Sequence, residues 1–175
     1  MLLYHGSHME IRTPDLNHGR YNLDFGKGFY VTGLAKQAEK WAGRRANMAR
    51  LVNGGSDAKP IVSVYELDLA GSGLKVLAFD GYSEEWLDFI VFNRGRKDPV
   101  VAGDCDVVFG DVANDDVAAV VDDYMRLLSK GRMDAEGKKF FLGQLRFSKP
   151  NDQYCIASTK AIDMLGFVES YEAGM

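Results

Sequence analysis

The sequence predicts one α+β domain over residues 1–175, with mainly antiparallel strands flanked by helices. A chain of 175 residues can bury its own hydrophobic core without a second domain. Apolar residues make up 46% of the chain and charged residues 26%, which is the balance of a globular protein. Strand-like and helix-like segments also mix without the regular strand–helix–strand alternation of a doubly wound sheet. No repeat, linker or low-complexity segment divides them.

The first third of the chain predicts two short strands around a long loop, followed by a helix. Residues 2–5 are apolar and form the first strand. Residues 10–25 are polar and aperiodic, so we expect a loop of the kind that often carries function. Residues 28–32 form a compact strand ending at Thr32, whose hydroxyl caps a helix over residues 34–52. Apolar residues recur along that helix at intervals of three and four.

The central segments predict two strands, a helix and a third strand. Residues 61–67 are rich in β-branched and aromatic side chains, and residues 74–79 form a second strand candidate. Ser83 begins a helix that ends near residue 93, because its hydroxyl caps free amides and two glutamates follow it. Residues 106–109 predict a short strand.

The last third of the chain predicts three helical segments and two strands. Helices are expected over residues 114–129 and 135–145, and one or two helical turns over residues 159–165. Strands are expected over residues 153–157 and 167–171. This order favours antiparallel pairing over parallel crossovers.

Charge and cysteine content disfavour several classes of protein. The net charge of −4, from 21 basic and 25 acidic residues, lacks the basic surface of a typical nucleic-acid binder. Cys105 and Cys155 are far apart, so we expect neither a disulfide nor a zinc site. His8 and His18 form no ligand pair, and we expect no metal. The first apolar segment is too short for a secretion signal or a membrane span, so we expect a cytoplasmic protein with no membrane partner.

A candidate ligand-binding motif, Tyr4-His5-Gly6-Ser7, lies at the end of the first strand. Gly6 has no Cβ, so a ligand can approach its backbone closely, and its amide and carbonyl can pair with a carboxamide. His5 can hydrogen-bond a ribose hydroxyl as donor or acceptor. The alternative is that His5 is a structural histidine whose hydrogen bonds are satisfied inside the protein.

Two aromatic residues and a polar loop complete the candidate site. Tyr30 lies on the strand over residues 28–32 and Trp41 on the following helix, so this unit can bring both rings to one opening. Two such faces can hold a flat heteroaromatic ring, and a cationic pyridinium gains further from the ring quadrupole. Arg20 and Asp24, in the preceding loop, are candidates for contact with a diphosphate or an acceptor. The alternatives are two core aromatic residues and a solvated loop.

These residues together resemble the ADP-ribosyltransferase superfamily, in the histidine–tyrosine–glutamate branch that includes diphtheria toxin and the poly(ADP-ribose) polymerases. His5 and Gly6 match the His-Gly motif of the first strand, Tyr30 matches the stacking tyrosine, and Trp41 stands where the second stacking aromatic does. The sequence is also similar to a group of small bacterial domains placed in that superfamily. That similarity is carried by residues 24–32, 37–38, 41–42, 85–91 and 112–115.

The resemblance implies split, mainly antiparallel sheets flanked by helices, with NAD as the ADP-ribose donor. The residues that it implies for NAD binding are His5, Gly6, Ser7, Arg20, Tyr30 and Trp41. In the family, the histidine holds a ribose hydroxyl, the glycine backbone holds the nicotinamide amide, and the two aromatic rings enclose nicotinamide.

The third motif departs from the family. The family's catalytic glutamate begins a late strand, and Gln153 begins the matching strand here. A glutamine can hydrogen-bond the ribose 2′-hydroxyl, but it adds no negative charge to the cationic transition state, a contribution worth roughly 10²–10³ in rate. The resemblance gives catalytic roles to Gln153, Tyr30 and His5. Because of Gln153, it implies weak or absent transfer rather than chain elongation.

The implied function is that of an NAD-dependent mono-ADP-ribosyltransferase, a toxin-like bacterial effector that modifies a protein or, as the less favoured acceptor, a nucleic acid. Such an effector can have an antitoxin or immunity partner. Two alternatives stay open. One is a catalytically weak or inactive NAD-binding module with the same fold, for which Gln153 is the evidence. The other is a structural domain without a nucleotide, with His5, Tyr30 and Trp41 buried in its core.

Overall fold

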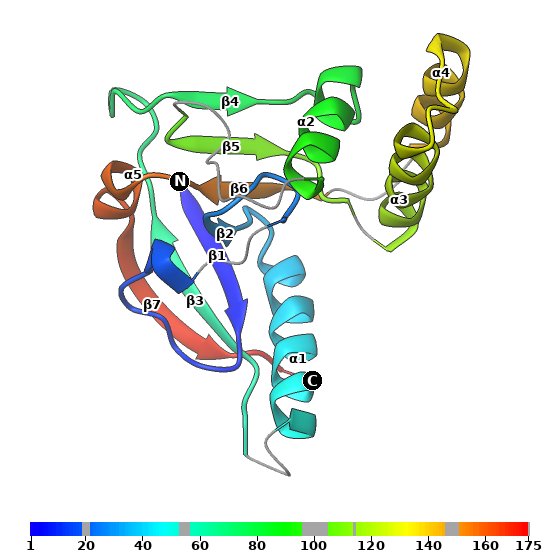
Figure 1. Ribbon diagram of the computed structural model, residues 1–175. Coiled ribbons are helices and arrows are strands. Elements are labelled where there is room, and N and C mark those ends of the chain that lie inside the picture. Colours follow the sequence, from blue (N-terminus) through cyan, green and yellow to red (C-terminus); the bar gives the residue numbers. More distant parts are fainter. Residues whose placement is uncertain (19–21, 53–56, 96–104, 114, 146–150, 175) are drawn as a thin grey trace.

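The computed structural model describes residues 1–18, 22–52, 57–95, 105–113, 115–145 and 151–174. These residues form two β-sheets with helices around them, so the α+β prediction is confirmed (Figure 1). Most strand pairs are antiparallel, as the order of the segments predicts. The elements also begin and end close to the residues that the sequence indicates.

The first sheet has three antiparallel strands in the order β1-β3-β7. They are β1 (Leu2–Ser7), β3 (Ile61–Glu66) and β7 (Gly166–Glu172). Strand β1 lies at one edge of this sheet, where Leu3 pairs with Tyr65 of β3. Only one side of β1 is therefore taken up by its own sheet.

The second sheet has four strands in the order β2-β6-β5-β4. They are β2 (Phe29–Val31), β6 (Gln153–Ile156), β5 (Val107–Gly110) and β4 (Val76–Ala78). The β4–β5 pair is parallel and the other two pairs are antiparallel. Strand β2 is the edge strand that faces the first sheet.

The two sheets join at one isolated bridge between Tyr4 and Thr32. The Tyr4 amide donates to the Thr32 carbonyl at 2.8 Å, and the Thr32 amide donates back to the Tyr4 carbonyl at 3.0 Å. Because the bridge is isolated, the β1–β2 ladder stops after this pair. The sheet is therefore split between β1 and β2.

Helix α1 (Ala35–Val52) packs on the first sheet through a row of small residues. Ala38, Ala42 and Ala46 are buried on its inner face. A Cβ at Gly6 would lie 2.1 Å from the Ala38 carbonyl oxygen and 2.7 Å from the Ala42 nitrogen. The missing side chain of Gly6 is thus what lets α1 approach β1 this closely.

The remaining helices are α2 (Glu84–Arg94), α3 (Asp115–Ser129), α4 (Ala135–Gln144) and the short α5 (Thr159–Asp163). Of these, α2 and α3 pack on the second sheet, α4 packs against α3, and α5 contributes to the layer between the sheets. The predicted cap is confirmed, because the Ser83 hydroxyl accepts from the Trp86 amide at 3.2 Å. The long loop before β2 contains a short 3-10 helix, Leu16–His18. Within the described part of the chain, no helix is both long and apolar enough to cross a bilayer.

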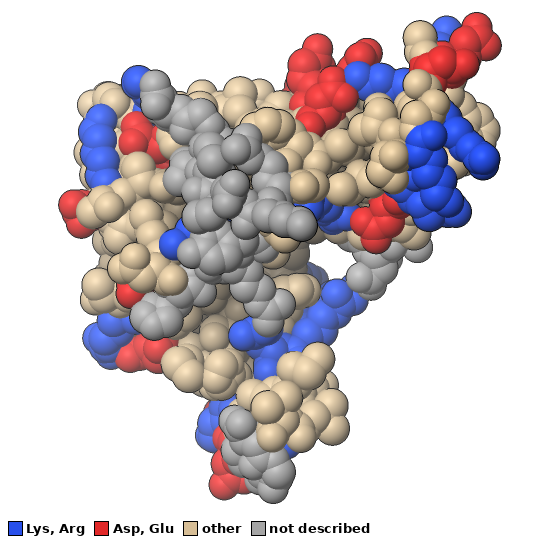
Figure 2. Space-filling model, viewed as in Figure 1, with Lys and Arg blue, Asp and Glu red and all other residues tan. Residues whose placement is uncertain are grey.

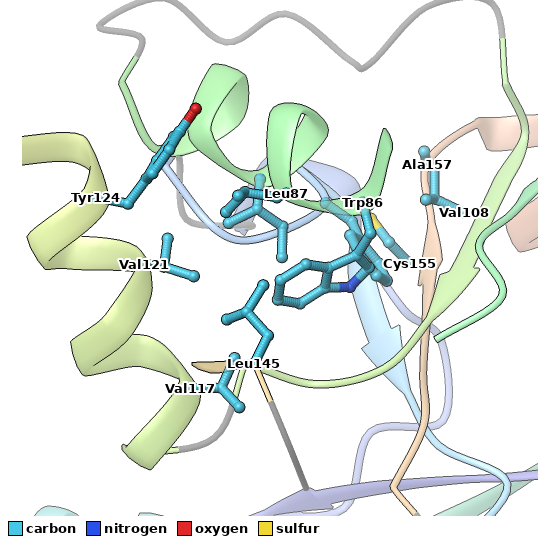
Figure 3. Close-up of a cluster of buried hydrophobic side chains, with 11 residues drawn as sticks. Trp86, Leu87, Val108, Val117, Val121, Tyr124, Leu145, Cys155 and Ala157 are labelled. Carbon is cyan, nitrogen blue, oxygen red and sulfur yellow. The ribbon is translucent and has the colours of Figure 1, made fainter. Parts of the chain in front are cut away.

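Buried side chains form a layer on each face of the second sheet. Figure 3 shows the layer on one face, where Trp86 and Leu87 of α2 meet Val117 and Val121 of α3. The layer on the other face lies between the two sheets, because it contains residues of both. Its members include Leu3, Phe29, Val31, Tyr65, Val107, Tyr154 and Ile156.

Candidate functional site

The split between the sheets exposes backbone groups of Gly6. In an antiparallel strand, consecutive residues direct their N–H and C=O groups to opposite sides. Tyr4 directs both groups at Thr32, so Gly6, two residues on, directs its groups to the same side. In a continued ladder they would meet Tyr30, but the bridge is isolated. The amide and carbonyl of Gly6 therefore have no hydrogen-bond partner within the described residues.

The side chain of His5 forms a hydrogen bond with the Tyr30 carbonyl of β2, which the missing strand pair leaves without a backbone donor. Its Nδ1 lies 2.7 Å from the Tyr30 carbonyl oxygen, which can only accept, so Nδ1 carries the proton. Burial lowers the pKa of His5, and the positive charge of Arg45 acts in the same direction, so the imidazole is neutral near pH 7. Its Nε2 is left as a hydrogen-bond acceptor. The ring stacks on Phe29, with centroids 4.4 Å apart.

Tyr30 is held in place by the loop that precedes β2. Its hydroxyl donates to the Gly26 carbonyl at 2.6 Å and accepts from the Phe25 amide at 3.1 Å. Burial raises the pKa of this hydroxyl, which therefore stays protonated. The ring packs against the layer that contains Trp86. Tyr30 is thus a neutral aromatic side chain in a fixed orientation.

The same loop is fixed to α2 through Asp24. The carboxylate of Asp24 pairs with Arg94 at 2.6 Å, and both side chains are mostly buried. Asn93 also donates to the Asp24 carbonyl at 3.2 Å. In this structure Asp24 therefore holds the loop rather than facing solvent, and its charge is neutralised within the protein. Arg20, the other candidate in this loop, lies outside the described residues.

Trp41 lies on the outer flank of α1 with 51% of its surface exposed. This exposure does not fit the alternative in which Trp41 belongs to the core. No ring contact joins Trp41 to Tyr30 among the described residues, so neither ring covers the other. Arg45 lies one helical turn beyond Trp41, close enough for its charge to act on His5.

Gln153 begins β6 and shares a face of the second sheet with Tyr30. Gln153 pairs with Gly110, and two residues later Cys155 pairs with Tyr30. Residues two apart on a strand share a face, as do paired residues on neighbouring strands. The side-chain nitrogen of Gln153 is buried and has no partner within the described residues. An unmade hydrogen bond of this kind costs about 1–3 kcal/mol, which a ligand with an acceptor group would remove.

The predicted site residues divide between two faces of the split sheet. Tyr4 packs with α1 and is bridged to Thr32, so Tyr30, two residues before Thr32, points to the side of α1. Gln153 points the same way. His5 instead stacks on Phe29, in the layer between the sheets, and the buried Ser7 alternates with Gly6 to that side as well. The imidazole and the two rings thus do not line one pocket; His5 reaches Tyr30 through its backbone.

The structure adds one residue that sequence reasoning missed. The carboxylate of Asp152 accepts from the Thr32 hydroxyl at 2.5 Å and from the Gly33 amide at 2.8 Å. Its carbonyl accepts from the Gln37 side chain at 2.6 Å. These partners lie 115 to 120 residues earlier in the chain, so no local pattern indicated them.

The surface beside this site is basic on α1. The helix carries five basic residues and one acidic residue, in a chain whose net charge is −4. Figure 2 shows Lys and Arg side chains gathered over this part of the molecule. No cluster of three or more possible metal ligands occurs among the described residues. The basic side chains of α1 therefore suit an anionic ligand.

The comparisons with known proteins give one match. Residues 1–167 match a family model described as "Protein of unknown function (DUF3990)". Neither the curated proteins nor the solved structures contain a significant match to the chain.

Proposed function

The chain belongs to the DUF3990 family of proteins of unknown function, and we propose that it is an NAD-dependent mono-ADP-ribosyltransferase. In this reaction the bond between C1′ of the ribose and the nicotinamide nitrogen breaks. A nucleophile of the acceptor forms the new bond to C1′ and loses its proton, and nicotinamide leaves. The observation that carries the proposal is that the amide and carbonyl of Gly6, at the split beside Tyr30, have no partner among the residues that the structure describes.

The backbone of Gly6 is complementary to nicotinamide. A carboxamide has one acceptor oxygen and an NH₂ donor, and Gly6 offers one donor and one acceptor on the same strand edge. Both pairings use backbone groups of the buried Gly6 that have no partner in the described part of the chain. Binding would therefore give hydrogen-bond partners both to the backbone of Gly6 and to the carboxamide of nicotinamide.

The electrostatics of the site suit the charge of NAD. The nicotinamide ring of NAD is a cation, and the faces of Tyr30 and Trp41 attract a cationic ring. A protonated His5 would oppose that charge, but burial keeps the imidazole neutral. The basic side chains of α1 offer attraction to the diphosphate at the other end of the ligand.

The glutamine at position 153 determines how fast we expect ADP-ribosyl transfer to be. Its amide can hydrogen-bond the nicotinamide ribose, and its buried nitrogen needs a partner. It brings no carboxylate to stabilise positive charge on the ribose as nicotinamide leaves, a loss of roughly 10²–10³ in rate. We therefore expect slow transfer of single ADP-ribose units. The resemblance to toxin-like effectors extends the proposal to a cytoplasmic protein that modifies a protein acceptor and is held by an antitoxin or immunity partner.

A second candidate follows from the same residue. With Gln153 in place of a glutamate, the protein can be an NAD-binding module that keeps the fold without turnover. This candidate shares the binding contacts of the first and differs only in the chemical step.

Titration with NAD tests binding, because the two tryptophans differ. Trp41 is half exposed, whereas Trp86 is buried and its indole donates to the Asp111 carbonyl. A pyridinium stacked on Trp41 should quench its fluorescence. The quenching should disappear in Trp41→Phe and persist in Trp86→Phe.

Incubation with NAD labelled in its ADP-ribose part, together with bacterial lysate, then tests transfer. Label in a macromolecule supports the transferase. Quenching without label supports the binding module. The absence of both rejects both candidates in favour of a structural domain.

A further inference from the structure

Asp152 connects the start of β6, where Gln153 lies, to the corner between β2 and α1. It directly precedes Gln153 in the chain, at the entry to β6. Its carboxylate accepts hydrogen bonds from the Thr32 hydroxyl at 2.5 Å and the Gly33 amide at 2.8 Å. Both donors lie at the corner between β2 and α1. One carboxylate therefore fixes the start of β6 to the end of β2.

The same contacts fix the start of α1. The Thr32 hydroxyl accepts from the Leu34 amide at 3.1 Å while it donates to Asp152. The Gln37 side chain, in the first turn of α1, donates to the Asp152 carbonyl at 2.6 Å. A carboxylate beside the first amides of a helix is also favoured by the helix dipole. The position of α1 along its axis and its rotation are thus tied to β6.

These ties link the two residues that would hold opposite parts of the donor. Trp41 lies one turn beyond Gln37, about 6 Å along the helix axis. Gln153 follows Asp152 directly. We propose that Asp152 is a positioning residue that fixes the distance between Trp41, which stacks on nicotinamide, and Gln153, which binds the ribose. This proposal rests on the proposed NAD site.

The chain provides a matched control at the opposite end of β6. There the carboxylate of Asp106 accepts from the Ser158 hydroxyl at 2.6 Å and from the Lys75 amide at 2.8 Å. Asp106 thus has the same kinds of partners as Asp152, one hydroxyl and one backbone amide. Its partners lie away from α1. A change of Asp106 to Asn removes the same charge without touching the link to Trp41.

The test compares Asp152→Asn with Asp106→Asn and the unaltered protein. The measurements are the melting temperature, the quenching of Trp41 at saturating NAD, and the rate of nicotinamide release at saturating NAD. If Asp152 positions the site, Asp152→Asn lowers the release rate about 10-fold or more and reduces the maximal quenching, since small misplacements of reacting groups have such effects. Asp106→Asn leaves both at the level of the unaltered protein.

Equal release rates and equal quenching in the two variants would overturn the proposal, whatever their melting temperatures. If Asp152→Asn does not fold, Gln37→Met carries the test, because it removes only the contact from the first turn of α1. Reduced quenching by NAD in that variant supports the proposal, and unchanged quenching overturns it. An unaltered protein that neither binds nor cleaves NAD refutes the proposed function, and the positioning role with it. Normal binding and cleavage without an effect of Asp152→Asn refutes the positioning role alone.

Discussion

Replacing Gly6 by alanine tests how closely α1 packs on β1 beside the split between the sheets. The new Cβ would lie 2.1 Å from the Ala38 carbonyl oxygen, and this is a backbone atom of a helix that cannot rotate away. To restore an ordinary contact, α1 must retreat by about 1 Å. Overpacking of this kind costs roughly 1–3 kcal/mol. For a chain of this size, each kcal/mol lowers the melting temperature by about 2–4 °C, so we expect a fall of about 2–12 °C.

The matched control for Gly6→Ala is Gly43→Ala, on α1, the helix that packs against Gly6. Apart from the neighbouring backbone of α1 itself, no atom of the described residues lies within 4 Å of a Cβ added at Gly43. Because glycine inside a helix is unfavourable, this change should raise the stability by about 0.5–1 kcal/mol. Thermal unfolding and NAD-induced quenching of Trp41 are measured on both variants. An unchanged melting temperature for Gly6→Ala would refute the close packing of α1 on β1. Normal quenching in a destabilised Gly6→Ala variant would show that the quenching of Trp41 by NAD does not depend on how closely α1 packs on β1.

Three further predictions concern charge. Gln153→Glu should raise nicotinamide release from NAD, by up to roughly 10²–10³; an unchanged rate with NAD still bound would mean that the third motif is elsewhere. Because burial lowers the pKa of His5, the folded protein binds its proton less readily than the unfolded chain, so stability is lost as the pH falls below the ordinary histidine pKa of 6.5. Urea unfolding at pH 7 and pH 5 should show a smaller loss in His5→Gln, and an equal loss would assign the acid effect to other groups. Arg94→Leu removes the ion-pair partner of the mostly buried Asp24 and should lower the free energy of unfolding, measured with urea, by about 3–5 kcal/mol. Lys59→Met removes one partner of an exposed ion pair and should change that free energy little. Similar losses in both variants would contradict the argument from burial.

The sequence predicted the elements because their signals are local. Ser83 and the two glutamates after it mark the start of α2, and the structure has the cap in that place. β-branched and aromatic residues likewise predicted a strand over residues 61–67, where β3 lies. Such signals depend on neighbours within a few positions, so no knowledge of the rest of the fold is needed.

The partners of the site residues were less predictable. The lack of a side chain at Gly6 was interpreted as room for a ligand, whereas the backbone of α1 lies where that side chain would be. Asp24 was interpreted as a ligand contact or a solvated residue, and its partner Arg94 lies 70 positions away. The contacts of Asp152 span 115 to 120 positions. No sequence spacing carries information over such separations.

The break between β1 and β2 is the strongest physical reason to look for a ligand here. One more antiparallel pair would join the amide and carbonyl of Gly6 to Tyr30 and would need no other partner. Instead, the Tyr30 carbonyl accepts from the His5 ring, and the buried Gly6 has no backbone partner on this side among the described residues. Two unmade backbone hydrogen bonds cost about 1–3 kcal/mol each. The Gln153 side-chain nitrogen, also buried and without a partner within the described residues, adds a similar cost. A ligand with complementary donors and acceptors would remove these costs, as the proposed NAD site requires.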